Sequence, residues 1–130
     1  MSKTVLIVED EFLVAMDLED IVSQAGYSVI GIAPDQETVS RMDALPDVAL
    51  VDLNLRDGPT GLAIARSLVA KGKTTVIFVT ANPRQISDPP IRSIGYVQKP
   101  FSADAILTAI DYAANGANRR LPHGLHLFHD

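Results

Sequence analysis

Short runs of consecutive aliphatic residues alternate along this chain with segments whose apolar residues recur every three or four positions. The runs have the length and composition of β-strands, and they occupy residues 4–8, 28–33, 48–53, 75–80 and 95–98. Because apolar residues stand on consecutive rather than alternate positions, the stronger runs predict strands that are covered on both faces. A sheet with a layer of helices on each side provides that environment.

Three of the intervening segments have the spacing of amphipathic helices. Residues 11–25 place their apolar side chains on one stripe, and Gly26 follows where a C-terminal cap is expected. The same spacing predicts helices at 61–71 and 103–114. The pattern at 35–44 is weaker, since only one apolar pair precedes a proline.

Strands that alternate with helices predict right-handed crossovers and a parallel sheet, which makes this an α/β, doubly wound fold. The segment 82–94 departs from the alternation, because Pro89 and Pro90 stand in its middle. A proline deep inside a helix costs about 3 kcal/mol and also pushes the residue before it out of helical geometry. We therefore expect a fourth helix that is short or irregular, or a mobile loop.

The length of 130 residues suits one domain. We assign residues 1–116 to this domain and residues 117–130 to a C-terminal tail, with no output domain. The tail holds three histidines spaced by three, but a proline and a glycine interrupt the helix that would align them as metal ligands. We expect the tail to be disordered. The histidines are His123, His126 and His129.

Charge and composition exclude several classes of partner. The formal net charge is −5, from 11 basic and 16 acidic residues, which argues against a nucleic-acid-binding surface. The chain has no cysteine, so it can form neither disulfides nor thiolate metal sites. No apolar stretch approaches the roughly 20 residues of a membrane span. These features predict a cytoplasmic protein.

Polar residues follow the predicted strands, and the carboxyl ends of parallel strands are where ligands bind. A few oxygen ligands at one edge suit Mg²⁺, which retains several waters and accepts one or two carboxylates. An aspartate beside the metal can accept a phosphoryl group when its charge is neutralised. The residues at this edge are Glu9 and Asp10, Asp52, Thr80 and Lys99.

Each of these residues also has an ordinary structural explanation. Glu9 and Asp10 could favour a helix N-terminus through the helix dipole, and Asp52 could cap the turn that follows it. Thr80 could be a simple β-former and Lys99 a solvated lysine. Taken together, these explanations require several independent coincidences at the same edge of the sheet, which favours a functional site.

The order of these motifs resembles the receiver domain of two-component response regulators over residues 3–114. The resemblance rests on the strand-end residues above together with Ala81, Tyr96 and the sequence Lys99-Pro100-Phe101. It implies a flavodoxin-like, five-stranded sheet in the order 2-1-3-4-5 with helices on both faces. Glu9 stands where many members of the family carry aspartate.

The resemblance also implies a role for each residue. Asp52 would accept the phosphoryl group from a histidine kinase or a histidine phosphotransfer protein. Mg²⁺ would be bound by Glu9, Asp10, Asp52 and the backbone carbonyl of Asn54.

The remaining residues would act on the phosphoryl group and its signal. Thr80, Ala81 and Lys99 would form the phosphoryl-binding region, and Tyr96 would be the aromatic switch residue. The peptide bond before Pro100 would be cis.

In such a protein the signal leaves by contact with a downstream effector protein, as a phosphorelay intermediate, a phosphate sink or an adaptor. It would catalyse only its own phosphorylation and dephosphorylation and would not otherwise be an enzyme. Two alternatives remain open. One is a degenerate receiver that acts as a phosphorylation-independent adaptor. The other is a Mg²⁺-dependent aspartyl-phosphate phosphohydrolase, although Asn54 stands where that class needs a second aspartate.

Overall fold

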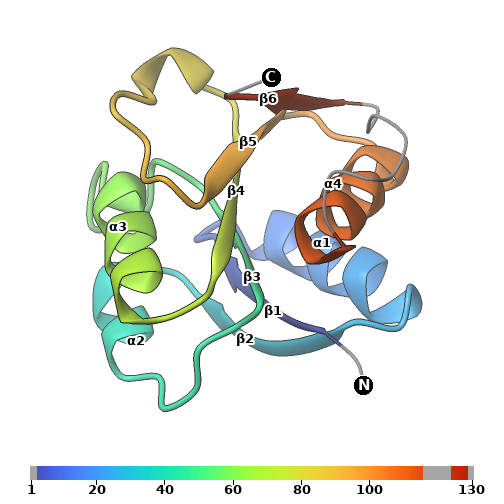
Figure 1. The fold of residues 1–130 in the computed structure, drawn as a ribbon, viewed down its shortest axis with the longest axis horizontal. Helices are drawn as coiled ribbons and strands as arrows, with labels where there is room; N and C mark the ends of the chain where they lie inside the picture. Colours follow the sequence, from blue (N-terminus) through green and yellow to red (C-terminus); the bar gives the residue numbers. More distant parts are fainter. Residues whose placement is uncertain (1–2, 116–123, 129–130) are drawn as a thin grey trace.

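A single sheet of six strands crosses the molecule, with helices on both faces (Figure 1). The computed structural model describes residues 3–115 and 124–128. The sheet order is β2-β1-β3-β4-β5-β6, and the first five strands are parallel, which confirms the predicted order 2-1-3-4-5. The strands are β1 (Thr4–Val8), β2 (Ser28–Ala33), β3 (Val48–Val51), β4 (Thr75–Thr80), β5 (Ser93–Gln98) and β6 (Leu125–Leu127).

Two helices cover each face of the sheet. In Figure 1, α1 and α4 lie on one side of the strands and α2 and α3 on the other. Among the residues that the structure describes, no helix is both long enough and apolar enough to cross a membrane. The helices are α1 (Phe12–Gln24), α2 (Gln36–Ser40), α3 (Gly61–Lys71) and α4 (Ala103–Asn115).

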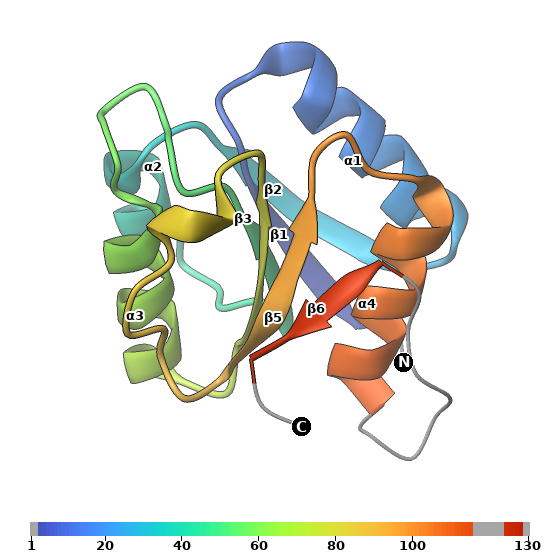
Figure 2. The same ribbon diagram turned by 90° about the horizontal axis from the view of Figure 1, so that it is seen from above.

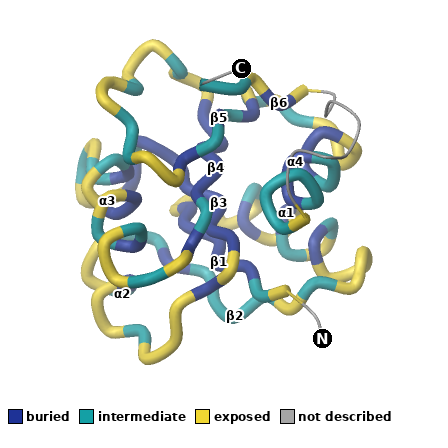
Figure 3. The backbone as a smooth tube through the Cα atoms, in the orientation of Figure 1, coloured by how far each residue is buried: buried dark blue, intermediate teal, exposed yellow. Residues whose placement is uncertain are grey.

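The consecutive apolar residues of the strands are explained by two separate cores. In β1, Val5 and Ile7 pack into the cluster that contains residues of α1 and α4. Leu6 and Val8 point the opposite way and pack into the cluster that contains residues of α2 and α3. Figure 3 shows the buried part of the chain concentrated along the central strands. The apolar residues of β1 and β3 are therefore buried whichever way they point.

The predicted helix at 35–44 is shorter in the structure, where α2 spans only Gln36–Ser40. Its one buried residue is Val39, so little packing energy supports a longer helix. Asp35 caps its N-terminus by accepting a hydrogen bond from the backbone N–H of Thr38 at 2.9 Å.

The expectation of a short or irregular fourth helix is confirmed. A single 3₁₀ turn, Pro83–Gln85, is the only helical structure between β4 and β5. The chain beyond it is fixed to α3, because Nη2 of Arg66 donates hydrogen bonds to the carbonyls of Ser87 (3.3 Å) and Asp88 (2.9 Å). Asp88 has φ 48°, a left-handed conformation immediately before the two prolines.

The C-terminal residues correct one expectation. Residues 125–127 are not disordered but form β6, which pairs antiparallel with β5. A strand of 3 residues is too short to give a periodic pattern, and this explains why the sequence did not predict it. His126 lies within β6, whereas His123 and His129 are outside the described residues.

Candidate functional site

Backbone hydrogen bonds hold the residues that follow the strands at one edge of the sheet. The N–H of Asp52 donates to the carbonyl of Val8 at 3.0 Å, which continues the β1–β3 pairing by one residue. In the same way, Lys99 donates its N–H to the carbonyl of Thr80 at 3.0 Å. The backbone pairing of the sheet therefore fixes the positions of Asp52 and Lys99 at this edge.

Three carboxylates form a cluster at this edge. Glu9, Asp10 and Asp52 each offer an oxygen atom, and these atoms lie within 4.8 Å of one another. Glu9 and Asp52 are only 2% and 6% exposed, whereas Asp10 is exposed to solvent. Hard oxygen ligands with an open, solvent-facing side fit Mg²⁺, which binds through a few carboxylates and keeps several waters.

Lys99 neutralises two of these acids. Its Nζ lies 2.6 Å from Oε1 of Glu9 and 3.0 Å from Oδ2 of Asp52, and its side chain is 14% exposed. Burial disfavours the charged ammonium, but the hydrogen bonds to Glu9 and Asp52 outweigh it and raise the pKa of Lys99. For Glu9 the balance is reversed, since burial raises the pKa of its carboxyl more than Lys99 lowers it. One ammonium therefore faces a cluster of three carboxyl groups, and a bound cation would stabilise the remaining negative charge.

Thr80 is the last residue of β4 and Ala81 follows it, and the backbone of Thr80 is hydrogen-bonded to that of Lys99. Thr80 is fully buried, and its Oγ1 accepts a hydrogen bond from the N–H of Asn82 at 3.0 Å. Ala81 is exposed and lines a cleft of about 390 Å³ together with Lys99, Pro100, Phe101, Val14 and Asp17. The Lys99–Pro100 peptide bond is cis.

Tyr96 and Asn54 make contacts that the sequence did not predict. The ring of Tyr96 stacks on that of His126 in β6, with centroids 4.7 Å apart and an interplanar angle of 13°. The side-chain amide of Asn54 donates to Oε1 of Gln85 at 2.8 Å. This bond connects the loop after β3 to the 3₁₀ turn after β4, and no sequence signal identified Gln85 in advance.

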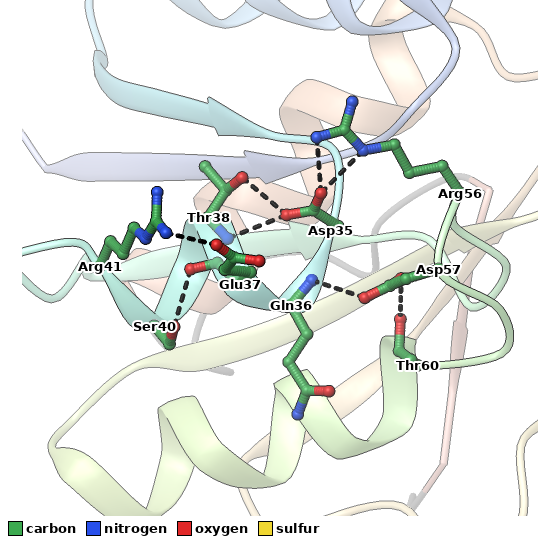
Figure 4. A network of polar contacts seen from close by, with 9 residues as sticks. All are labelled: Asp35, Gln36, Glu37, Thr38, Ser40, Arg41, Arg56, Asp57 and Thr60. Carbon is green, nitrogen blue, oxygen red and sulfur yellow. Dashed lines mark hydrogen bonds and ion pairs between the residues drawn. The ribbon is translucent and has the colours of Figure 1, made fainter.

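The loop between β3 and α3 is fixed at its outer side by two aspartates (Figure 4). Asp57 accepts hydrogen bonds from the backbone N–H of Gln36 at 3.0 Å and from the hydroxyl of Thr60 at 2.7 Å. Arg56 donates from Nε to Oδ2 of Asp35 at 2.7 Å. These bonds hold residues 54–60 against the start of α2, and so they restrict the backbone that follows Asp52.

This network predicts a pH dependence of stability that involves Asp35. Hydrogen bonds from Thr38 and then Arg56 lower the pKa of its carboxyl from 3.8 to about 2. A lowered pKa means that the unfolded chain binds the proton first, so the stabilisation is present above 3.8 and lost as the pH falls towards 2. Asp35→Asn should therefore lose less stability than wild type over this interval, measured by urea unfolding.

Asp43→Asn is the control for that measurement, because Asp43 is exposed and no hydrogen bond or ion pair joins it to the rest of the described chain. It should reproduce the wild-type pH dependence. Equal pH dependence in Asp35→Asn and wild type would show that the Asp35 contacts do not stabilise the fold.

Comparison with known proteins identifies one family and several relatives. Residues 5–111 match the family described as response regulator receiver domain. The Phyllosphere-induced regulator PhyR of Methylorubrum extorquens is 32% identical over 130 residues, which cover 95% of this chain and 49% of PhyR. The transcriptional regulatory protein PdtaR of Mycobacterium tuberculosis is 30% identical over 122 residues, which cover 88% of this chain and 58% of PdtaR. The chain thus spans about half the length of these curated relatives.

Solved structures show the same fold. The solution NMR structure of the PhyR receiver domain from Erythrobacter litoralis has a TM-score of 0.76 and 33% identity, covering 92% of this chain and 95% of that domain. The crystal structure of the anti-anti-sigma factor PhyR from Bartonella quintana has a TM-score of 0.71 and 30% identity, covering 88% of this chain and 48% of that protein.

Proposed function

Because this chain belongs to the response regulator receiver domain family, we propose that it accepts a phosphoryl group on Asp52 from a histidine kinase or a histidine phosphotransfer protein. The observation that supports this proposal most directly is the position of Asp52. It is a nearly buried carboxylate at a strand end, with Lys99 at 3.0 Å from one oxygen and two further acids within 4.8 Å. This is the environment that phosphoryl transfer to an aspartate needs.

In the proposed transfer, Asp52 is the nucleophile. A carboxylate oxygen of Asp52 forms a bond to phosphorus, and the P–N bond to the donor histidine breaks with its electron pair going to the imidazole nitrogen. Lys99 already holds Oδ2 of Asp52, which leaves the other oxygen as the attacking atom. The protein's contribution is position and charge neutralisation rather than covalent chemistry.

Glu9, Asp10, Asp52 and the backbone carbonyl of Asn54 would hold Mg²⁺, an assignment that the acidic cluster supports. The ion would supply positive charge to the phosphoryl oxygens. The Asn54–Gln85 hydrogen bond and the Arg56–Asp35 contact restrict the loop that carries this carbonyl.

Thr80 and Tyr96 are proposed to respond to the new charge. The hydroxyl of Thr80 accepts a hydrogen bond from Asn82, and its own O–H remains available as a donor to a phosphoryl oxygen. Movement of Thr80 would be passed to Tyr96 on the neighbouring strand, since Thr80 pairs with Gln98 only two positions further along β5. We propose that the signal leaves by protein contact, as the name anti-anti-sigma factor suggests for one relative.

The test is phosphorylation by acetyl phosphate or a phosphorylated phosphotransfer protein in the presence of Mg²⁺, followed by intact mass measurement. Wild type should gain one phosphoryl group, and Asp52→Asn should gain none. The chain offers a matched control in Asp47, which stands directly before β3 whereas Asp52 stands directly after it. Asp47→Asn should be phosphorylated like wild type.

Three results would contradict the proposal. A mass gain that survives in Asp52→Asn would place the phosphoryl group elsewhere. A folded wild type that gains no mass with any donor would favour the phosphorylation-independent adaptor. Continuous release of phosphate from a phosphomonoester would instead favour the phosphohydrolase.

A further inference from the structure

The edge of β5 is covered by a strand from the C-terminal end of the described chain. β6 runs antiparallel to β5 and lies beside it at the border of the sheet (Figure 2). The pairing extends one residue beyond the strand, because the N–H of Phe128 donates to the carbonyl of Ile94 at 3.0 Å. The paired residues are Gly95 with Leu127, Tyr96 with His126, and Val97 with Leu125.

Three side chains fix this short strand on the sheet. Leu125 is 8% exposed and belongs to the core cluster that contains Ile106 of α4. His126 stacks flat on Tyr96. Phe128 places its ring 6.1 Å from that of Phe78, which is fully buried in β4. The contact therefore uses an aliphatic anchor, a planar ring and an aromatic anchor in sequence.

Gly95 leaves space for the backbone of the added strand. A Cβ at this position would lie 2.1 Å from the carbonyl oxygen of His126, 2.9 Å from its carbonyl carbon and 3.0 Å from Cα of Leu127. These three nearest atoms all belong to β6, so the glycine is explained by the strand that covers it. Any side chain here would push that strand away.

The pairing is too short to be permanent on its own. β6 has only 3 residues. Elements this short open with a lower free energy than the central strands of a fold. A sheet edge with unpaired N–H and carbonyl groups binds an extended peptide from any source that fits. Another segment with the side-chain pattern of β6 could therefore replace it.

We propose that the edge of β5, with Gly95 and Tyr96 at its centre, is a binding site for an extended segment of a partner protein, and that β6 occupies this site in the free chain. The partner segment would pair antiparallel with β5. It would carry a leucine-like residue in the position of Leu125, a planar side chain over Tyr96, and an aromatic residue in the position of Phe128. If the proposed function is correct, the site includes the residue that responds to Asp52, but peptide binding itself needs no phosphorylation.

The experiment uses full-length protein without phosphodonor and a fluorescent peptide with the sequence of residues 124–130, GLHLFHD. Leu125→Asp removes the buried anchor of β6 and leaves β5 unchanged. Fluorescence anisotropy should show this variant binding the peptide at least tenfold more tightly than wild type, in which β6 competes. The same peptide with aspartate at its leucine-125 position should not bind.

A second substitution tests whether the edge of β5 is the site. Gly95→Ala added to Leu125→Asp should abolish binding, since the new Cβ would meet the peptide backbone as it meets β6. Gly31→Ala in the same background is the matched control. Gly31 is also a strand glycine, and its nearest neighbour is the flexible end of Met42 at 3.0 Å, so binding should persist.

Leu125→Ala, a milder change, is measured in parallel and should show the same direction of effect if Leu125→Asp does not fold. The absence of peptide binding by a folded Leu125 variant would overturn the proposal. Binding that is unchanged by Gly95→Ala would also overturn it, because the peptide would then be bound elsewhere. Since no phosphodonor is present, neither result depends on phosphorylation of Asp52.

Discussion

Gly61→Ala is expected to lower the free energy of unfolding by about 3 kcal/mol, the upper part of the range for overpacking. A Cβ at Gly61 would lie 2.1 Å from the carbonyl oxygen of Asp52 and 2.6 Å from Cα of Leu53. Both atoms are backbone, so no side-chain rotation relieves the contact. The gain in helix propensity from alanine, at most about 1 kcal/mol, is too small to compensate.

Urea unfolding measures this effect as a lower midpoint at an unchanged slope. Gly31→Ala is the control, because its close neighbour is the flexible side chain of Met42. A loss below about 1 kcal/mol in Gly61→Ala would mean that the turn after β3 yields easily. The same variant should also phosphorylate slowly, since the overlap displaces the backbone of Asp52 itself.

Lys99→Met should destabilise the protein by about 3 kcal/mol at neutral pH. Removal of one partner of a buried ion pair leaves the other charge uncompensated, and losses of about 3–5 kcal/mol are typical. Here two acids, Glu9 and Asp52, lose the ammonium that lies 2.6 Å and 3.0 Å from them. The side chain of Lys99 is 14% exposed, so partial access of water places the expected loss at the lower limit.

Two further measurements separate charge from packing. Glu9→Gln combined with Lys99→Met should recover part of the lost stability, because it removes one of the two uncompensated charges. Millimolar Mg²⁺ should stabilise Lys99→Met more than wild type, since the ion would take over the neutralisation of the same carboxylates. If neither change restores stability, the loss is one of packing.

Lys73→Met is the control for these experiments. Lys73 is exposed and no salt bridge joins it to the described residues, so its replacement should change stability by less than about 0.5 kcal/mol.

The strands and their order were predictable because the sheet is buried on both faces. The run Val5–Val8 is apolar at every position, and the structure buries every one of these side chains in one of the two cores. The irregular segment after β4 was predictable for a different reason, since Pro89 and Pro90 exclude a helix by geometry alone. Short elements such as α2 and β6 were not, because they contribute too few residues to form a pattern.

The candidate site was predictable only as a set of strand ends. Parallel strands bring their carboxyl ends to one edge, so Glu9, Asp52 and Lys99 had to be near one another. Which of them pair depends on side-chain conformation across 90 positions of sequence for Lys99 and Glu9, and periodicity does not carry that information. The contacts of the β3–α3 loop, such as Arg56 with Asp35, were missed for the same reason.

The location of β6 on the same chain as β5 has a quantitative consequence for any competitor. A tethered segment acts as though present at a concentration on the order of 1 mM. A free partner segment with the same intrinsic affinity for β5 as β6, present at micromolar concentration, would then be bound to roughly one protein molecule in a thousand. Half occupancy would require about 4 kcal/mol of additional preference, from a better-fitting partner segment, from weakened docking of β6, or from both. The pairing of β6 with β5 therefore sets a minimum affinity for the proposed site. Peptides that bind the edge of β5 more weakly than this do not displace β6, whereas a partner segment of higher affinity does.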